Sequence, residues 1–160
     1  MHMSLLGEQA IIDDRAGSVQ VRSSRAVALV AFLAVRAGSP QSRQRIAGLL
    51  WPDSTDAQAL TNLRRELHHL RRVLGDEASL VVTPRDLCWR DTKTCRVDVR
   101  VFDNERKAAI AAAAGEDDGI LVHAAAAIAV YRGELLPGST KTGCWMPGHS
   151  SSASAWSCAT

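Results

Sequence analysis

The chain has 160 residues, a net charge of +2 and a hydrophobic fraction of 46%, but only 4% of its residues are aromatic. This length suits one ordinary domain, or one small domain with part of a second, built around an aliphatic core. The small net charge excludes a molecule that is polybasic throughout, so any nucleic-acid signal must be local.

The sequence gives no sign of export or of a membrane span. No charged segment followed by an apolar stretch stands near the start, and the run from Ala26 to Val35 is too short to cross a bilayer. An even number of cysteines would permit disulfides, but the missing signal favours reduced thiols. The cysteines show neither CxxC pairs nor metal-ligand spacing: Cys88, Cys95, Cys144 and Cys158. We expect a cytoplasmic protein without metal or cofactor.

Short strands are expected first. Leu5-Leu6-Gly7 and Ala10-Ile11-Ile12 are apolar runs, a turn follows at residues 13–17, and Val19 to Arg22 alternates with period two. Ser23 or Ser24 then caps a helix that ends at Gly38-Ser39-Pro40.

Two consecutive helices follow. Ser42 caps a short helix from Arg43 to Leu50, which Trp51-Pro52-Asp53 ends, because proline disfavours helix at the residue before it. The next helix runs from Asp53 to Gly75, with Asp53 or Ser54 as its cap and Gly75 as its stop. Two helices joined by a tight corner, the second long and basic, are typical of a helix-turn-helix.

The helix at residues 53–75 has two opposed faces. Leucines recur at steps of three and four residues and predict an apolar stripe packed on a core: Leu60, Leu63, Leu67, Leu70 and Leu74. The opposite face is rich in guanidinium and amide groups: Gln58, Thr61, Asn62, Arg65, His69 and Arg72. Arg64 and Arg71 flank the stripe, and His68 lies at the edge of the polar face.

This polar face has two interpretations. It is either an ordinary solvated surface or a surface for a polyanion. Between Leu60 and Leu74 only Glu66 is acidic, and this asymmetry favours the polyanion.

A β-hairpin is expected directly after the basic helix. Leu80 to Thr83 forms one strand, Pro84-Arg85-Asp86 a turn, and Leu87 to Arg90 the returning strand. A hairpin at this place is what a winged helix requires. Arg85 at its tip is either a phosphate contact or a simple exposed arginine, and Trp89 is expected to pack against the helix rather than to stack on a base.

The last third of the chain predicts a helical hairpin. Residues 95–102 are expected to be extended and to lead into a helix near Asp103. Two alanine-rich helices follow, Asn104 to Ala114 and Gly119 to Tyr131. Ser139 to Thr160 has no periodicity and offers little to bury, so we expect it to be disordered or loosely attached.

Several stretches resemble the Streptomyces antibiotic regulatory protein (SARP) family of transcriptional activators, from about Leu5 to Gly138. The most specific are LLWPD at 49–53 and YRGELLPG at 131–138. The others are Ser23-Ser24-Arg25, residues 43–48, LRREL at 63–67, LRRVL at 70–74, and Val97-Asp98-Val99 with Phe102.

The resemblance implies an α+β fold: an OmpR-like winged helix-turn-helix domain with short N-terminal strands and a hairpin wing, at residues 1–97. A truncated all-α segment of tetratricopeptide type, the start of a bacterial transcriptional activator domain, would occupy 98–138, and 139–160 would be an off-pattern tail. The family binds direct repeats upstream of promoters and helps to recruit RNA polymerase, so the implied partners are double-stranded DNA, RNA polymerase and, on DNA, a second copy of the chain.

The tail departs from the family after Gly138. The family continues with an acidic-Trp segment and further helices, whereas this chain has Lys141 to His149. Our hypothesis is a one-base shift in reading frame, because codons for Lys-Thr-Gly-Cys-Trp-Met-Pro read in the adjacent frame can give an acidic residue followed by Asp-Trp-Leu-Leu-Asp-Ala. Resequencing the gene tests this, and related genes with the same uninterrupted tail would contradict it.

The expected function is that of a sequence-specific transcriptional regulator whose 53–75 helix enters the major groove. The DNA-binding candidates divide by side chain. Those for base edges are Thr61, Asn62, Arg65 and His69, and those for phosphates are Arg64, Arg71, Arg72 and Arg85. His68, at the edge of the polar face, is also a DNA-binding candidate.

The sequence leaves two other classes of function to consider. A protein-interaction module would use the basic helix or the alanine-rich hairpin, and it would not retard random duplex at low salt. An enzyme is not expected, because the phosphate loop, GxSxG and HExxH motifs are missing, and His68 and His69 point about 100° apart on a helix. His123, alone among alanines, is expected to be a surface or packed histidine.

Overall fold

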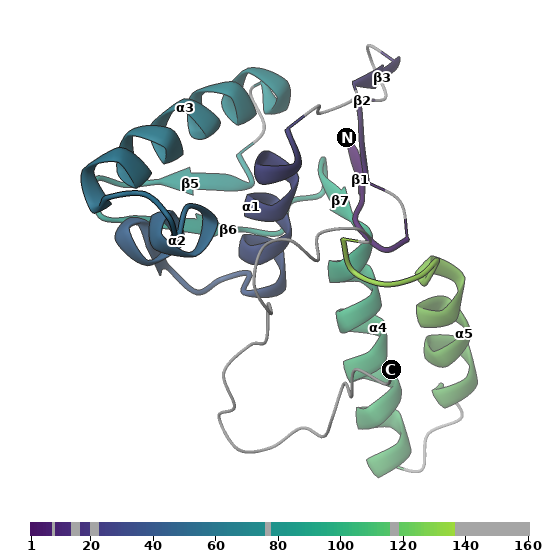
Figure 1. Cartoon of the computed structure of the whole chain (residues 1–160). Helices are drawn as coiled ribbons and strands as arrows, with labels where there is room; N and C mark the ends of the chain where they lie inside the picture. Colours follow the sequence, from purple (N-terminus) through teal and green to yellow (C-terminus); the bar gives the residue numbers. More distant parts are fainter. Residues whose placement is uncertain (8, 14–16, 20–22, 76–77, 116–118, 137–160) are drawn as a thin grey trace, which may run out of the picture.

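A computed structural model describes residues 1–7, 9–13, 17–19, 23–75, 78–115 and 119–136 (Figure 1). Within these residues the chain is a mixed α/β fold with five helices and two small sheets. In chain order the elements are β1 (His2–Ser4), β2 (Ala10–Asp13), β3 (Gly17–Val19), α1 (Ser24–Val35), β4 (Gln41–Ser42), α2 (Arg43–Leu50), α3 (Asp56–Leu74), β5 (Leu80–Val82), β6 (Asp86–Trp89), β7 (Arg96–Val97), α4 (Asp98–Ala114) and α5 (Ile120–Val130).

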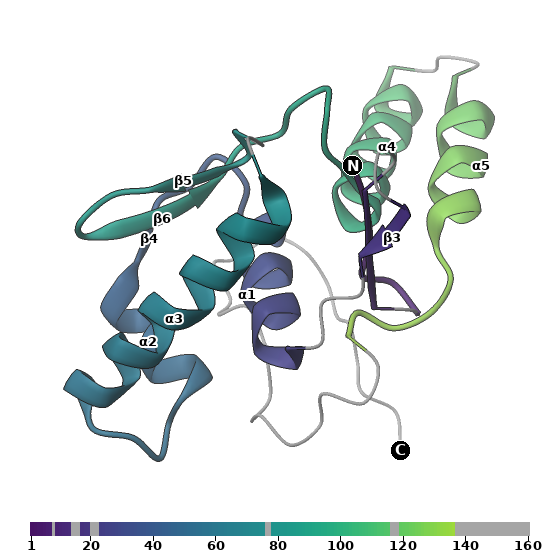
Figure 2. The ribbon, with the colours of Figure 1, turned by 90° about the horizontal axis from the view of Figure 1, so that it is seen from above.

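The first three helices and a three-stranded sheet of order β4-β6-β5 enclose an aliphatic core (Figure 2). The largest fully buried side chains here come from all of these helices and from β6: Leu29, Leu33, Ile46, Leu50, Leu63, Leu70, Leu87 and Trp89. Trp89 is only 1% exposed, so the expectation that it packs inside is confirmed. Helix α3 lies at the surface of this core and packs against it through one apolar stripe.

Helix α1 begins as the sequence predicts. The Ser23 hydroxyl accepts a hydrogen bond from the backbone N–H of Ala26 at 3.3 Å, which satisfies one of the donors left open at a helix start. Eight of the twelve residues of α1 are buried, so this helix is the centre of the core. Ser42 stands at the start of α2 as predicted, but its side chain makes no capping hydrogen bond.

Helix α3 starts later than predicted. Neither Asp53 nor Ser54 caps it; Thr55 does, accepting from the backbone N–H of Gln58 at 3.4 Å. The reason is a turn, in which the Ser54 N–H donates to the Trp51 carbonyl at 3.1 Å and keeps Asp53 and Ser54 out of the helix. The predicted stop is confirmed, since Gly75 ends α3 with a φ of +59°, a region that favours glycine.

The second sheet joins the N-terminal strands to β7 in the order β3-β2-β1-β7. Strand β1 is antiparallel to β2 and parallel to β7. The predicted strand at Leu5 and Leu6 is wrong in place, because β1 covers His2–Ser4 and Leu6 instead forms an isolated bridge with Leu135. The extended segment predicted for 95–102 is also wrong, because β7 ends at Val97 and α4 begins at Asp98.

Helices α4 and α5 pack against each other as the predicted helical hairpin (Figure 1). Phe102 and Tyr131 hold their rings 5.7 Å apart, and His123 Nδ1 lies 2.7 Å from Glu105 Oε2, so His123 is a half-exposed histidine that links the two helices. Three apolar side chains of α5 are largely exposed: Leu121, Val122 and Ile128.

An ion network stabilises the first turns of α4. Arg100 binds Asp91 at 2.7 Å, and this hydrogen bond raises the pKa of Arg100 despite its partial burial. Partial burial alone would raise the pKa of Asp103, but the hydrogen bonds and charges of Lys107 and Arg106 outweigh it, so the pKa of Asp103 is lowered.

The segment after α5 returns to the N-terminal strand. Gly7 N–H donates to the Glu134 carbonyl at 2.9 Å, and Leu136 N–H donates to the Leu5 carbonyl at 3.0 Å. A Cβ on Gly7 would clash with the Arg132 carbonyl oxygen, so these two segments of the chain can approach this closely only with glycine there. The Asp98 carboxylate completes the junction by accepting from the backbone N–H groups of Leu5 and Leu6 at 2.8 and 2.9 Å.

Several expectations fall on residues outside the described ranges. These are most of the turn at 13–17, the end of the strand at 19–22, the break at 116–118, and the tail from 139 to 160 with Cys144 and Cys158. Cys88 and Cys95 are free thiols. Among the described residues, no helix is long and apolar enough to cross a membrane.

Candidate nucleic-acid interface

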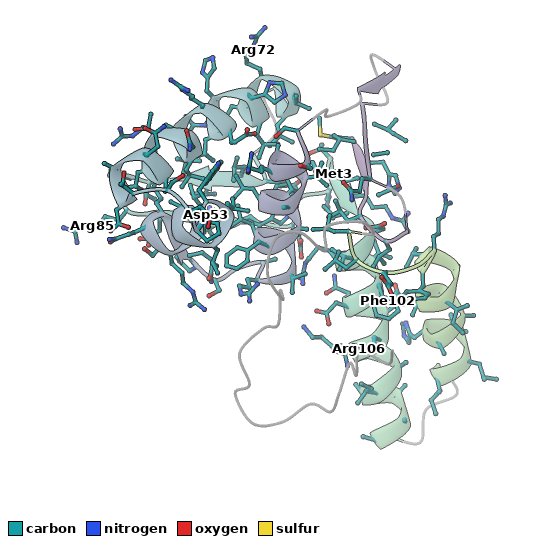
Figure 3. The ribbon with its side chains drawn as sticks, in the orientation of Figure 1. Met3, Asp53, Arg72, Arg85, Phe102 and Arg106 are labelled. Atoms are coloured by element: carbon teal, nitrogen blue, oxygen red, sulfur yellow. The ribbon has the colours of Figure 1, made fainter. Side chains whose placement is uncertain are left out.

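Helix α3 presents one face to the core and the other to solvent. Its 19 residues span about 28 Å at 1.5 Å per residue. The predicted stripe is confirmed for Leu63, Leu67, Leu70 and Leu74, which are buried, whereas Leu60 is half-buried. The opposite face therefore points outward, and Figure 3 shows Arg72 projecting from it near the C-terminal end of α3.

Most candidate residues lie at the surface without an internal partner. The exposed candidates are Arg64, Arg65, His68, His69, Arg71, Arg72 and Arg85. None of their side chains makes a hydrogen bond or an ion pair with another residue of the described ranges. Guanidinium groups that are not paired with groups of the protein can bind an external anion.

Thr61 and Asn62 differ from the others because they are half-buried and already hydrogen-bonded. The Thr61 hydroxyl donates to the Ala57 carbonyl at 2.9 Å, and Asn62 Oδ1 accepts from Gln58 Nε2 at 3.1 Å. Thr61 therefore keeps an acceptor oxygen for a ligand, and Asn62 keeps its amide donors. The pair is oriented by its own helix before any ligand arrives.

Glu66, the acidic residue within the basic stretch of α3, is engaged elsewhere. Its Oε2 accepts from the Ser23 hydroxyl at 2.9 Å, the same hydroxyl that caps α1. Glu66 is half-buried at this contact between α1 and α3. Its carboxylate therefore ties the two helices together and does not pair with the arginines of the outer face.

The tip of the β5–β6 hairpin packs against the start of α2. The backbone N–H of Arg43 donates to the Arg85 carbonyl at 2.9 Å, and Arg43 Nη1 donates to the Thr83 carbonyl at 3.3 Å. The Arg85 side chain points outward, on the opposite side of this part of the fold from Arg72 (Figure 3). Arg85 is thus an exposed basic residue at the hairpin tip, beside the start of α2.

Sequence reasoning missed Arg43 and Gln44 as positioning residues. Gln44 Nε2 donates to Asp56 Oδ2 at 3.3 Å and so connects α2 to the first turn of α3. Arg43 connects α2 to the hairpin tip, as described above. Both contacts join segments that are apart in sequence, so no local pattern signalled them.

The possible metal ligands and the histidines of α3 are the groups that bear on other chemistries. Within the described ranges, no group of three His, Cys, Asp or Glu side chains gathers to hold a metal ion. His68 and His69 are exposed on α3, and neither contacts a carboxylate or thiol there. The arrangement can bind an anionic surface by charge and hydrogen bonding.

Comparison with known proteins gives a likeness in fold. No family model matches the sequence, and no curated protein matches it. Among solved structures, the chain is similar to EmbR of Mycobacterium tuberculosis, solved in complex with a low affinity phosphopeptide, at a TM-score of 0.67 and 23% sequence identity. The likeness covers 84% of this chain and 37% of the EmbR chain, so the chain spans well under half of EmbR's length. At this identity the comparison shows a shared fold.

Proposed function

We propose that the chain is a sequence-specific DNA-binding transcriptional regulator of the SARP type. One observation carries the proposal: α3 exposes four arginines that have no side-chain partner among the described residues, on a helix whose leucines are buried in the core. The EmbR-like fold and the SARP-like motifs support it. In this proposal α2 and α3 are the helix-turn-helix and the β5–β6 hairpin is the wing.

The proposed mode of binding places α3 in the major groove, which is about 12 Å wide and admits a helix. Arg65 and His69, at the centre of the exposed face, would reach base edges together with the preoriented Asn62 and Thr61. Arg64, Arg71 and Arg72 would contact phosphates, as would Arg85 from the wing. Phosphate contacts would supply most of the affinity, and base contacts would supply the specificity.

The finer parts of the proposal rest on the family resemblance. They are activation from direct repeats near promoters, contact with RNA polymerase, pairing of two copies on DNA, a non-enzymatic role in the cytoplasm, and α4–α5 as the start of a tetratricopeptide-like activator domain. Activation, contact with RNA polymerase and pairing on DNA each require that DNA is bound.

Selection from a random duplex library tests the proposal. We expect one enriched sequence motif, and its absence would refute sequence-specific binding. On the selected site, Arg65→Ala should cost about 1–3 kcal/mol and relax the preference at one position. Arg72→Ala, as the matched control, should weaken selected and random duplexes alike, because a phosphate contact carries no sequence information.

A protein-interaction module is the second candidate, and the exposed apolar side chains of α5 favour it. Leu121 is 80% exposed, Ile128 73% and Val122 69%, which is unusual for three large apolar residues on one short helix. A gel shift on random duplex at low salt separates the candidates. Retention of the duplex supports DNA binding, and its absence supports the interaction module.

A further inference from the structure

A cavity lies at the junction between the N-terminal sheet and the α4–α5 hairpin, apart from α3. Its polar lining residues are His2, Ser4, Arg96, Asp98 and Arg132, and Ala129 and Val130 at the end of α5 line it as well. The cavity is partly open to solvent, and Arg96 and Arg132 are exposed at its rim. Its volume is about 70 Å³. A single water needs about 10–15 Å³ by the same measure, so the cavity has room for several waters or for one anion with four oxygens.

The strand register explains why basic groups gather there. Side chains alternate along a strand, so His2 and Ser4 share one face of β1, while Met3 points the opposite way and is fully buried. In the parallel pair of β1 and β7, His2 stands beside Arg96 and Met3 beside Val97. His2 and Arg96 therefore project from the same face of the sheet, toward α5.

The acidic group in the cavity keeps its charge but makes no ion pair with these bases among the described residues. Asp98 Oδ2 accepts from the N–H groups of Leu5 and Leu6, and its Oδ1 accepts from the N–H of Val99 at 2.6 Å. Its two oxygens are thus engaged by backbone donors. The side chains of Arg96 and Arg132 make no hydrogen bond or ion pair with another residue of the described ranges.

The backbone fixes Arg132 at this place. Gly133, with a φ of +148°, and Gly7 lie against each other, and a Cβ on Gly133 would be 3.0 Å from the Gly7 Cα. The hydrogen bond from Gly7 to Glu134 holds the same turn. Arg132 comes from a segment 36 positions after Arg96, yet the fold brings both to one cavity.

We propose that this cavity is a binding site for the phosphoryl group of a small molecule, held between Arg96 and Arg132 with His2 and Ser4 as further donors. Two guanidinium groups that have no side-chain partner in the described part of the chain suit a phosphate, because each offers a planar fork of donors to its oxygens. The site joins the N-terminal sheet to the α4–α5 hairpin, so an occupant would stabilise their junction. This proposal stands independently of DNA binding.

The test is a titration of the full chain with inorganic phosphate against chloride at equal ionic strength, followed by ¹H–¹⁵N NMR. We expect saturable shifts confined to residues 2–7, 96–98 and 129–133. Arg96→Ala and Arg132→Ala should each weaken phosphate binding about tenfold or more, the loss expected for a charge-assisted hydrogen bond. Arg90→Ala, an exposed arginine outside the cavity, should bind phosphate as the parent does.

Other results would overturn the proposal. Shifts spread over the whole surface, or unchanged in the Arg96 and Arg132 variants, would mean general ion effects. A random DNA duplex that displaces phosphate and shifts the same residues would make the cavity part of a nucleic-acid surface.

Should Arg132→Ala disturb the spectrum without ligand, Arg132→Lys and Arg96→Gln provide milder variants. A nucleoside monophosphate that binds more tightly than inorganic phosphate would identify a phosphate ester as the source.

Discussion

Asp98→Ala tests how the two parts of the fold are joined. The Asp98 carboxylate is 5% exposed and accepts from the buried N–H groups of Leu5 and Leu6 at 2.8 and 2.9 Å. Alanine would leave both donors without an acceptor, at a cost of about 1–3 kcal/mol for each buried group. The expected loss is therefore about 2–6 kcal/mol, a large share of the roughly 5–15 kcal/mol by which most domains are stable.

Urea denaturation measures this loss as a lower midpoint with an unchanged slope. Asp53→Ala is the matched control, because Asp53 is exposed and should change stability by no more than about 0.5 kcal/mol. Asp98→Asn should fall between the two, since its oxygen can still accept from Leu5 and Leu6 while its amide faces the Val99 N–H. Equal midpoints for Asp98→Ala and Asp53→Ala would refute the role given to this carboxylate.

Two further stability predictions follow from single contacts. Gly133→Ala should lower the free energy of unfolding by more than about 1 kcal/mol, because of its positive φ and the 3.0 Å approach to Gly7. Gly48→Ala, in α2 with open space around it, should raise the free energy of unfolding by about 0.5–1 kcal/mol. Asp103→Asn should cost about 0.5–1 kcal/mol at pH 7, through lost contacts with Lys107 and Arg106. Because the pKa of Asp103 is lowered in the fold, its contribution is fully present above the unfolded value of about 3.9 and is lost as the pH falls through the lower, folded value. Denaturation at pH 7 and at a series of acidic pH values should show the difference between parent and variant shrinking as the pH falls, and a constant difference would contradict this.

The helices of the DNA-binding candidate were predictable from local pattern. Leucines at three- and four-residue steps in α3 fix which face is buried, and so they also fix which face carries the arginines. The Pro84-Arg85-Asp86 turn between two apolar runs predicted the β5–β6 hairpin, and the pairing of Val82 with Leu87 confirms it. These signals are short in range, which is why the sequence alone was enough.

The cap of α3 and the start of α4 were not predictable in the same way. Asp53, Ser54 and Thr55 are all competent caps, and a turn back to Trp51 selects the third. Val97, Val99 and Val101 alternate with period two and imitate a strand, but Asp98 opens a helix. That choice depends on the bond from Asp98 to residues 92 and 93 positions earlier, beyond any local window.

The candidate site also combines residues predictable from local pattern with residues whose position depends on long-range contacts. The members on α3 follow from helical periodicity, whereas the place of Arg85 depends on its backbone contact with Arg43, 42 positions earlier in the chain. The engagement of Glu66 by Ser23 is also a long-range contact, and it explains why the one acid among these arginines leaves them unpaired.

The salt dependence of binding to random duplex tests the central claim most directly. Four phosphate contacts, from Arg64, Arg71, Arg72 and Arg85, predict that the logarithm of the association constant falls with the logarithm of salt concentration at a slope of about −3.6. Removing these four side chains should bring the slope close to zero, whereas a control that removes Arg90, Lys93, Arg106 and Lys107 should keep most of it. An equal loss of slope in both variants would contradict the assignment of DNA binding to the outer face of α3.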